Sequence, residues 1–98
     1  MAVLDKDTGL VTKDITAENT FSDGLYVVGD FNLSISGTFV GTVTVQRSFD
    51  LGATWRDVDT FTAPIETAGS DPEPVVVYRA GIKTGEYTSG TASIRIGR

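Results

Sequence analysis

The chain has 98 residues, a length that allows one domain with one modest core. It contains no cysteine and no histidine, which excludes disulfides, thiolate metal sites and every catalytic pair that depends on histidine. Thirteen acidic residues against eight basic ones give a net charge of −5, and the basic residues are spread along the chain. Because nucleic-acid binders draw much of their affinity from clustered Lys and Arg, we expect no nucleic-acid partner.

The beginning of the sequence, Met1–Asp7, carries acidic residues where a secretory signal would have a basic head followed by an apolar stretch. No apolar run approaches the roughly 20 residues that a membrane-spanning helix needs. We therefore expect a protein that is made in the cytoplasm without Sec-type export and that has no membrane partner.

Polar and apolar residues alternate along most of the chain, as in the series Phe31, Leu33 and Ile35, and such runs are rich in Thr, Val and Ile. Turn sequences such as Ser36-Gly37 separate the runs. In chain order, this pattern predicts strands near residues 10–16, 24–29, 31–37, 39–48, 54–62, 74–83 and 91–97. About seven short strands at this spacing predict an all-β fold: a single antiparallel β-sandwich, Ig-like or jelly-roll-like.

The first twenty residues are mostly polar and have few apolar side chains to pack. Two alternatives follow for residues 1–20: an N-terminal arm that orders on a neighbouring subunit, or an edge strand of the sandwich. Residues 21–98 form the sandwich domain in either case.

Residues 63–74 contain all three prolines of the chain together with three acidic residues. Pro72 and Pro74 have no backbone N–H to give to a β-ladder. We therefore predict a solvated loop over this stretch.

The predicted strand at 54–62 has an imperfect pattern, because Val58 has the opposite parity to Trp55 and Phe61. Either a β-bulge or burial on both faces would explain the mismatch.

Acidic residues occur at two places that resemble parts of metal or catalytic sites. Asp5 and Asp7 have the opening spacing of a calcium loop, but the third carboxylate and the closing Glu are missing. Glu66, Asp71 and Glu73 lie in the predicted loop, which would not hold them at the fixed separation that glycosidases require. We therefore predict no metal ion, no cofactor and no enzymatic activity.

The stretch Ser48–Trp55 fits the pattern Ser-x-Asp-x-Gly-x-Thr-Trp, with Ser48, Asp50, Gly52, Thr54 and Trp55 at the defined positions. It resembles the Asp-box of sialidases and of many other β-proteins. An Asp at such a place can bind backbone amides of a turn, and Gly can adopt positive φ. Asp-box enzymes resemble multi-bladed propellers with several copies of the box, whereas this chain has one copy and too few residues. The box therefore predicts a structural β-hairpin.

Two longer stretches, Gly37–Asp59 and Val77–Thr91, resemble small β-sandwich virion proteins of tailed bacteriophages, of the head-decoration or fibre type. The resemblance implies a non-enzymatic structural component that binds capsid, portal or tail proteins as part of the head, collar or tail. It also implies a homo-oligomer that is made in the host cytoplasm and resides in the virion.

The alternative function is a carbohydrate-binding β-sandwich module that attaches a particle or a protein to glycans. Such a module would need a row of exposed aromatic side chains. The alternating pattern instead directs Phe31 and Phe39 inward, which leaves few aromatic residues for that role.

Overall fold

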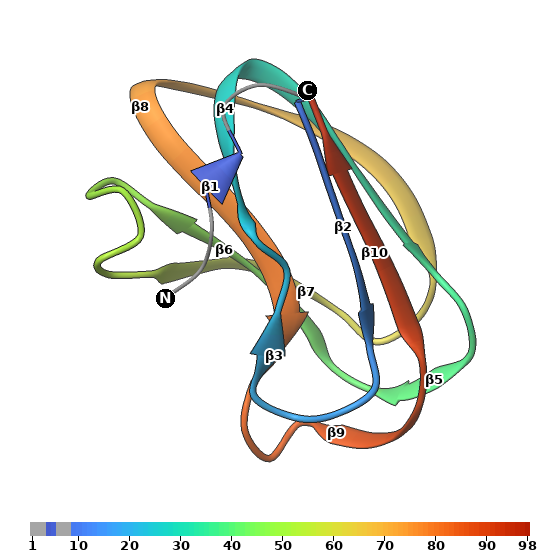
Figure 1. Ribbon diagram of the computed structural model, residues 1–98. Coiled ribbons are helices and arrows are strands. Elements are labelled where there is room, and N and C mark those ends of the chain that lie inside the picture. Colours follow the sequence, from blue (N-terminus) through green and yellow to red (C-terminus); the bar gives the residue numbers. More distant parts are fainter. Residues whose placement is uncertain (1–3, 6–8) are drawn as a thin grey trace.

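The computed structural model describes Leu4–Asp5 and residues 9–98, and the regular elements in these ranges are all strands (Figure 1). This confirms the predicted all-β class. No helix long and apolar enough to span a membrane is found in the described ranges. The strands are β1 (Leu4–Asp5), β2 (Leu10–Ile15), β3 (Thr20–Phe21), β4 (Gly24–Ser36), β5 (Phe39–Gly41), β6 (Val43–Ser48), β7 (Arg56–Phe61), β8 (Ile65–Ile82), β9 (Tyr87–Gly90) and β10 (Ala92–Gly97).

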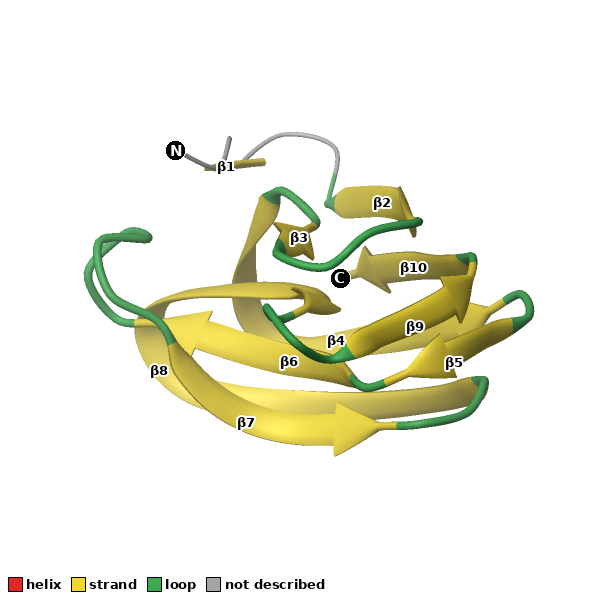
Figure 2. Ribbon diagram, turned by 90° about the horizontal axis from the view of Figure 1, so that it is seen from below, coloured by secondary structure: helices red, strands yellow, loops and turns green. Residues whose placement is uncertain are grey.

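Two long strands, β4 and β8, run through both layers of the sandwich. The C-terminal half of β4 and the N-terminal half of β8 form one layer with β10 and β2. The other halves form the second layer with β6, β7 and the short strands β1 and β3. Figure 2 shows β2 and β10 on one side of the molecule and β6 and β7 on the other. The pairings are antiparallel apart from that of β1 with β4.

The prediction of a solvated loop over residues 63–74 is wrong, because β8 already begins at Ile65. Residues 65–71 pair with β4 in a regular antiparallel register. The register then shifts, so that Val28 of β4 stands opposite residues 72–75 of β8. Pro72 and Pro74 lie within this bulge, where a residue need not donate to the ladder.

Two further strand boundaries differ from the pattern-based prediction. A single strand, β4, replaces the predicted strands at 24–29 and 31–37, because Gly29, with φ of 77°, forms part of the bulge and not a turn. The predicted strand at 39–48 is divided at Thr42 into β5 and β6, and β5 pairs with β9 in a small separate sheet.

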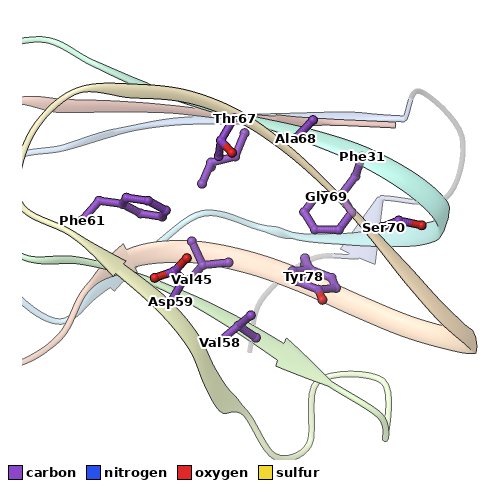
Figure 3. Close-up of a pocket in the computed structure, with 11 residues that line it drawn as sticks. Phe31, Val45, Val58, Asp59, Phe61, Thr67, Ala68, Gly69, Ser70 and Tyr78 are labelled. Carbon is purple, nitrogen blue, oxygen red and sulfur yellow. The ribbon is translucent and has the colours of Figure 1, made fainter.

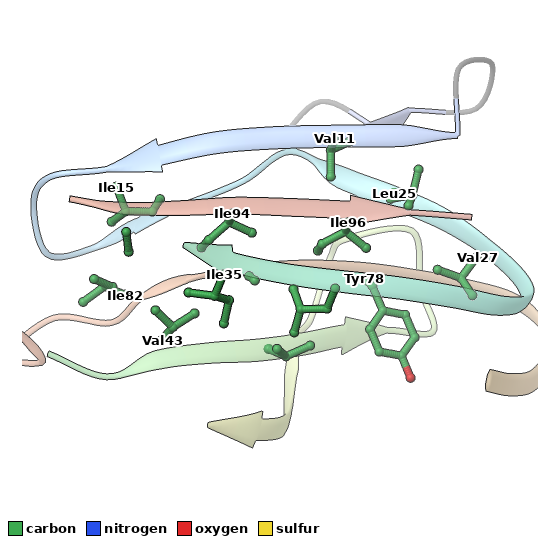
Figure 4. Close-up of a cluster of buried hydrophobic side chains, with 14 of the residues drawn as sticks. Val11, Ile15, Leu25, Val27, Ile35, Val43, Tyr78, Ile82, Ile94 and Ile96 are labelled. Carbon is green, nitrogen blue, oxygen red and sulfur yellow. The ribbon is translucent and has the colours of Figure 1, made fainter. Parts of the chain in front are cut away.

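The core lies between the two layers (Figure 4). It is built from the residues that the period-two pattern directs inward, and it joins strands far apart in the sequence, so most of its contacts are non-local. Its members, all nearly inaccessible to solvent, are Val11, Ile15, Leu25, Val27, Leu33, Ile35, Val43, Val45, Val76, Tyr78, Ala80, Ile82, Ala92, Ile94 and Ile96.

Strand β2 is the edge strand of its layer and pairs with β10 from Ile15 opposite Ala92 to Leu10 opposite Gly97. The side chains of Val11 and Ile15 are buried in the core. Within the first twenty residues, Leu10–Ile15 thus forms an edge strand, whereas the alternative of an arm also involves residues 1–3 and 6–8, which lie outside the described residues. Strand β2 is therefore part of the sandwich itself.

Replacing Gly81 with Ala is expected to lower the free energy of unfolding by about 2–3 kcal/mol. A Cβ at this position would lie 2.1 Å from the carbonyl oxygen of Thr20 and 2.5 Å from Cα of Phe21, so β3 would have to move away from β8. Urea unfolding measures the change. Gly85→Ala is the control, because a Cβ at Gly85 would meet no described atom within 4 Å and only the φ of 83° opposes the substitution. Equal losses for the two variants would contradict the close packing of β3 on Gly81.

Candidate functional site

The hairpin between β6 and β7 is held by side chains of the Ser48–Trp55 motif. Ser48 Oγ donates to Asp50 Oδ1 (2.7 Å) and accepts from the amide of Gly52 (2.8 Å). Asp50 also accepts from Thr54, through Oδ1 from the amide (2.8 Å) and through Oδ2 from the hydroxyl (2.6 Å). Four of the five motif residues that the sequence singles out therefore meet within this one turn.

The hydrogen bonds that Asp50 accepts stabilise its charged form. Those from the side chains of Thr54 and Ser48 contribute most and lower the pKa of Asp50 from 3.8 to about 2. The hairpin therefore gains stability from this carboxylate above pH 3.8, and the gain is lost as the pH falls through about 2. Leu51, at the tip, has φ of 60°, a left-handed conformation that is uncommon for a residue with a branched side chain.

Trp55, the fifth motif residue, does not enter the core. It lies partly buried on the outer face of the second layer, where its ring centroid is 4.2 Å from the guanidinium carbon of Arg79. Phe21 of β3 lies at the same distance from this carbon. The guanidinium of Arg79 thus contacts two aromatic rings from distant parts of the chain, an arrangement that cation–π attraction favours.

A polar network continues from Arg79 across the same face. Arg79 Nε donates to Gln46 Oε1 (2.9 Å), and Gln46 Nε2 donates to Asp57 Oδ1 (2.9 Å). The other oxygen of Asp57 pairs with Lys83 Nζ (2.7 Å). This pairing lowers the pKa of Asp57 and raises the pKa of Lys83. Together the residues hold the beginning of β7 against β6 and β8.

An opening between the two layers lies at the edges formed by β7 and by the N-terminal half of β8, beyond which no further strand pairs among the described residues (Figure 3). The cavity has a volume of about 220 Å³. Phe31 and Tyr78, with ring centroids 4.5 Å apart, form part of its wall, and Phe61 and Val58 contribute from β7.

The expected irregularity in the strand at 54–62 is a bulge. Asp59 stands opposite Val45 and Asp57 opposite Gln46, which leaves Val58 without a cross-strand partner. Asp59 also lines the opening between the layers. A bulge and acidic side chains on an edge strand discourage pairing with the edge of another sheet.

Asp71 lies beside the bulge, where β8 bends from one layer of the sandwich into the other (Figure 1). Its side chain is buried, and its Oδ2 accepts from the hydroxyl of Tyr78 (2.7 Å) and from Arg47 Nη1 (3.1 Å). Its Oδ1 accepts from the amide of Glu73 (3.0 Å). Burial alone would raise the pKa of Asp71, but these hydrogen bonds outweigh it and lower the pKa below its ordinary value. Burial and the nearby carboxylate raise the pKa of Tyr78 to about 12.

The three acids of the predicted loop thus have separate surroundings. Asp71 is buried in the bend, whereas Glu73 is exposed and Glu66 accepts a hydrogen bond from Ser34 on β4. The calcium-loop spacing of Asp5 and Asp7 lies outside the residues whose side chains the structure describes. In the described ranges, no group of three or more acidic side chains is placed to hold a metal ion.

Four large apolar side chains are exposed toward one end of the sandwich. Val28 and Val75 flank the bulge between β4 and β8, with exposed fractions of 75% and 50%. Phe49 and Leu51 lie at the tip of the β6–β7 hairpin, with exposed fractions of 44% and 52%. The pairing of β8 with both β4 and β6 places the bulge and the hairpin at the same end (Figure 1). We call these four residues the apolar end.

Comparison with known proteins identifies no family for this chain. No protein-family model matches the sequence, and no curated protein or solved structure shows a significant match to it.

Proposed function

We propose that the protein is a non-enzymatic structural component of a bacteriophage virion and that it binds other virion proteins through the apolar end. The observation that supports this most directly is the exposure of Phe49 and Leu51. Both lie within Gly37–Asp59, one of the two stretches that resemble small phage virion proteins. The proposed setting is the head, collar or tail of the particle, with the protein present as a homo-oligomer.

Apolar surface that stays in contact with water costs free energy. Each large apolar side chain that moves from water into an interface contributes roughly 1.5–3 kcal/mol at full burial. Exposed apolar side chains that gather on one part of a soluble domain commonly mark a contact with another protein. Val28, Leu51 and Val75 are each at least half exposed, so an interface could bury most of their surface.

The alternative, a carbohydrate-binding module, has less support. Sugar binding usually relies on aromatic rings whose faces are open to the ligand. Among the described aromatic residues only Phe49 is exposed, and Phe21 and Trp55 lie partly buried against Arg79. No row of open rings is present on the described surface.

The proposal is tested with a triple variant, Val28→Thr, Leu51→Asn and Val75→Thr. Thr keeps the β-branched shape that strands favour, and Asn tolerates the positive φ of Leu51, so the melting temperature is expected to change little. Attachment to purified particles that lack the protein is expected to weaken by at least about tenfold, because each lost interface side chain contributes more than about 1 kcal/mol.

Val40→Thr is the matched control. Val40 is 57% exposed but belongs to β5, away from the apolar end, so this variant is expected to attach normally. Light scattering of the wild-type protein measures the proposed self-association. Normal attachment of the triple variant would rule out the apolar end as the contact, and a protein that binds no particle component would refute the virion function.

A further inference from the structure

Arg79 is a partly buried cation without an anionic partner among the described residues. In that part of the chain, its guanidinium contacts two aromatic rings and donates one hydrogen bond to Gln46, and no carboxylate forms an ion pair with it. Arg47 and Lys83, by contrast, each pair with an Asp. Burial lowers the pKa of Arg79, because partial removal from water disfavours the charged form. A desolvated charge is costly unless an opposite charge accompanies it.

A surface depression lies directly beside this guanidinium. It has a volume of about 410 Å³ and is formed by the loop that precedes β3, the outer face of β6 and β8, and the turn after β8. Nε of Arg79 is engaged by Gln46, whereas its terminal nitrogens donate to no group among the described residues. The residues that line the depression are Asn19, Phe21, Gln46, Arg79, Lys83 and Thr84.

We propose that this depression binds a carboxylate, supplied by an acidic side chain of another polypeptide. The terminal nitrogens of a guanidinium form a planar fork that matches the two oxygens of a carboxylate. The rings of Phe21 and Trp55 each lie 4.2 Å from the guanidinium carbon, and the polar residues Asn19 and Thr84 also line the rim of the depression. The bound carboxylate supplies an anionic partner for the guanidinium of Arg79.

The geometry favours a peptide carboxylate over an acidic sugar. A sugar ring would need an open aromatic face beside the charged group. The aromatic ring that lines the depression is that of Phe21, and it contacts Arg79. The inference rests on the surroundings of Arg79 and is independent of the apolar end, which lies on other residues.

The test is an NMR titration of ¹⁵N-labelled protein with N-acetyl-glutamate α-amide at constant ionic strength. We expect saturable shifts of the Nε–Hε signal of Arg79 and of the indole signal of Trp55. The neutral probe N-acetyl-glutamine α-amide is expected to shift neither. Arg79→Lys keeps the charge but loses the fork, so its affinity is expected to fall at least about fivefold. Arg95→Lys, which alters an exposed arginine bound to Asn32, is the matched control with unchanged affinity.

A second variant covers the case in which Arg79→Lys does not fold. Asn19 has φ of 52°, which Gly adopts without strain, so Asn19→Gly removes a rim contact while keeping the loop. A weaker affinity in this variant supports the proposal. The proposal is overturned if the glutamate probe binds no better than the glutamine probe, or if both site variants bind like the wild type. Binding of glucuronate with no binding of the glutamate probe would also overturn it, in favour of an acidic sugar.

Discussion

Deletion of residues 1–17 is expected to leave a chain that does not fold. The deletion removes β2, which contributes Val11 and Ile15 to the core and a complete row of pairs to β10. Burial of two such side chains contributes roughly 3–6 kcal/mol, and the loss also exposes the core face of β10. Small domains have a total stability of about 5–15 kcal/mol, so little would remain. Far-UV circular dichroism during a urea titration measures the outcome as a missing cooperative transition.

Point variants of β2 separate the loss of packing from the loss of chain length. Ile15→Ala is expected to lower the free energy of unfolding by about 2–4 kcal/mol, because Ile15 is fully buried. Thr12→Ala, at an exposed position of the same strand, is expected to change it by less than about 0.5 kcal/mol. If the deleted protein still unfolds cooperatively with near-normal stability, β2 is dispensable, and the N-terminal arm becomes the better description.

Replacing Asp71 with Ala is expected to destabilise the protein by about 2–4 kcal/mol. The substitution leaves the hydroxyl of Tyr78 and the amide of Glu73 without their acceptor at the bend of β8, and it removes the ion-pair partner of Arg47. Chemical unfolding measures the loss. Glu73→Ala is the matched control, since Glu73 is exposed and takes part through its backbone amide, which the variant keeps. Equal stability of the Asp71 variant and the wild type would show that the bend does not need this anchor.

The carboxylate of Asp71 also makes the stability of the protein depend on pH in the acidic range. Because folding lowers the pKa of Asp71, the unfolded chain takes up a proton at a higher pH than the folded one. The stabilisation is complete above pH 3.8 and is lost as the pH falls through the lower pKa of the folded state. Asp71→Asn is therefore expected to be less stable at neutral pH but to lose less stability on acidification, as measured by thermal melts.

The sequence pattern predicted the fold class and most strands, because the alternation of polar and apolar residues indicates which side chains face the core. It placed β2, β7 and β10 to within a residue or two. It placed the C-terminal half of β8 but missed the N-terminal half, where Pro72 and Pro74 are typical of a loop and the bulge that accommodates them has no marker of its own. The strands β3 and β9 are too short to show a period.

The contacts of the candidate sites also differ in whether the sequence could predict them. The hairpin contacts of Ser48, Asp50 and Thr54 are local, so a motif of eight residues could predict them. The contact of Arg79 with Phe21 and Trp55 joins residues that are 58 and 24 positions away in the sequence, and it depends on which strands become neighbours. The alternation of polar and apolar residues indicates that Arg79 faces away from the core, but it does not indicate which residues of other strands contact it.

The passage of β4 and β8 through both layers determines how the two layers can unfold. In a sandwich whose layers are joined only by loops, one layer can open while the other keeps its hydrogen bonds. Here the layers share the same paired ribbon, and Asp71 fixes the point where β8 turns from one to the other. Opening either layer strains the ladder that holds the second one. The two layers are therefore expected to exchange their amide hydrogens as one cooperative unit.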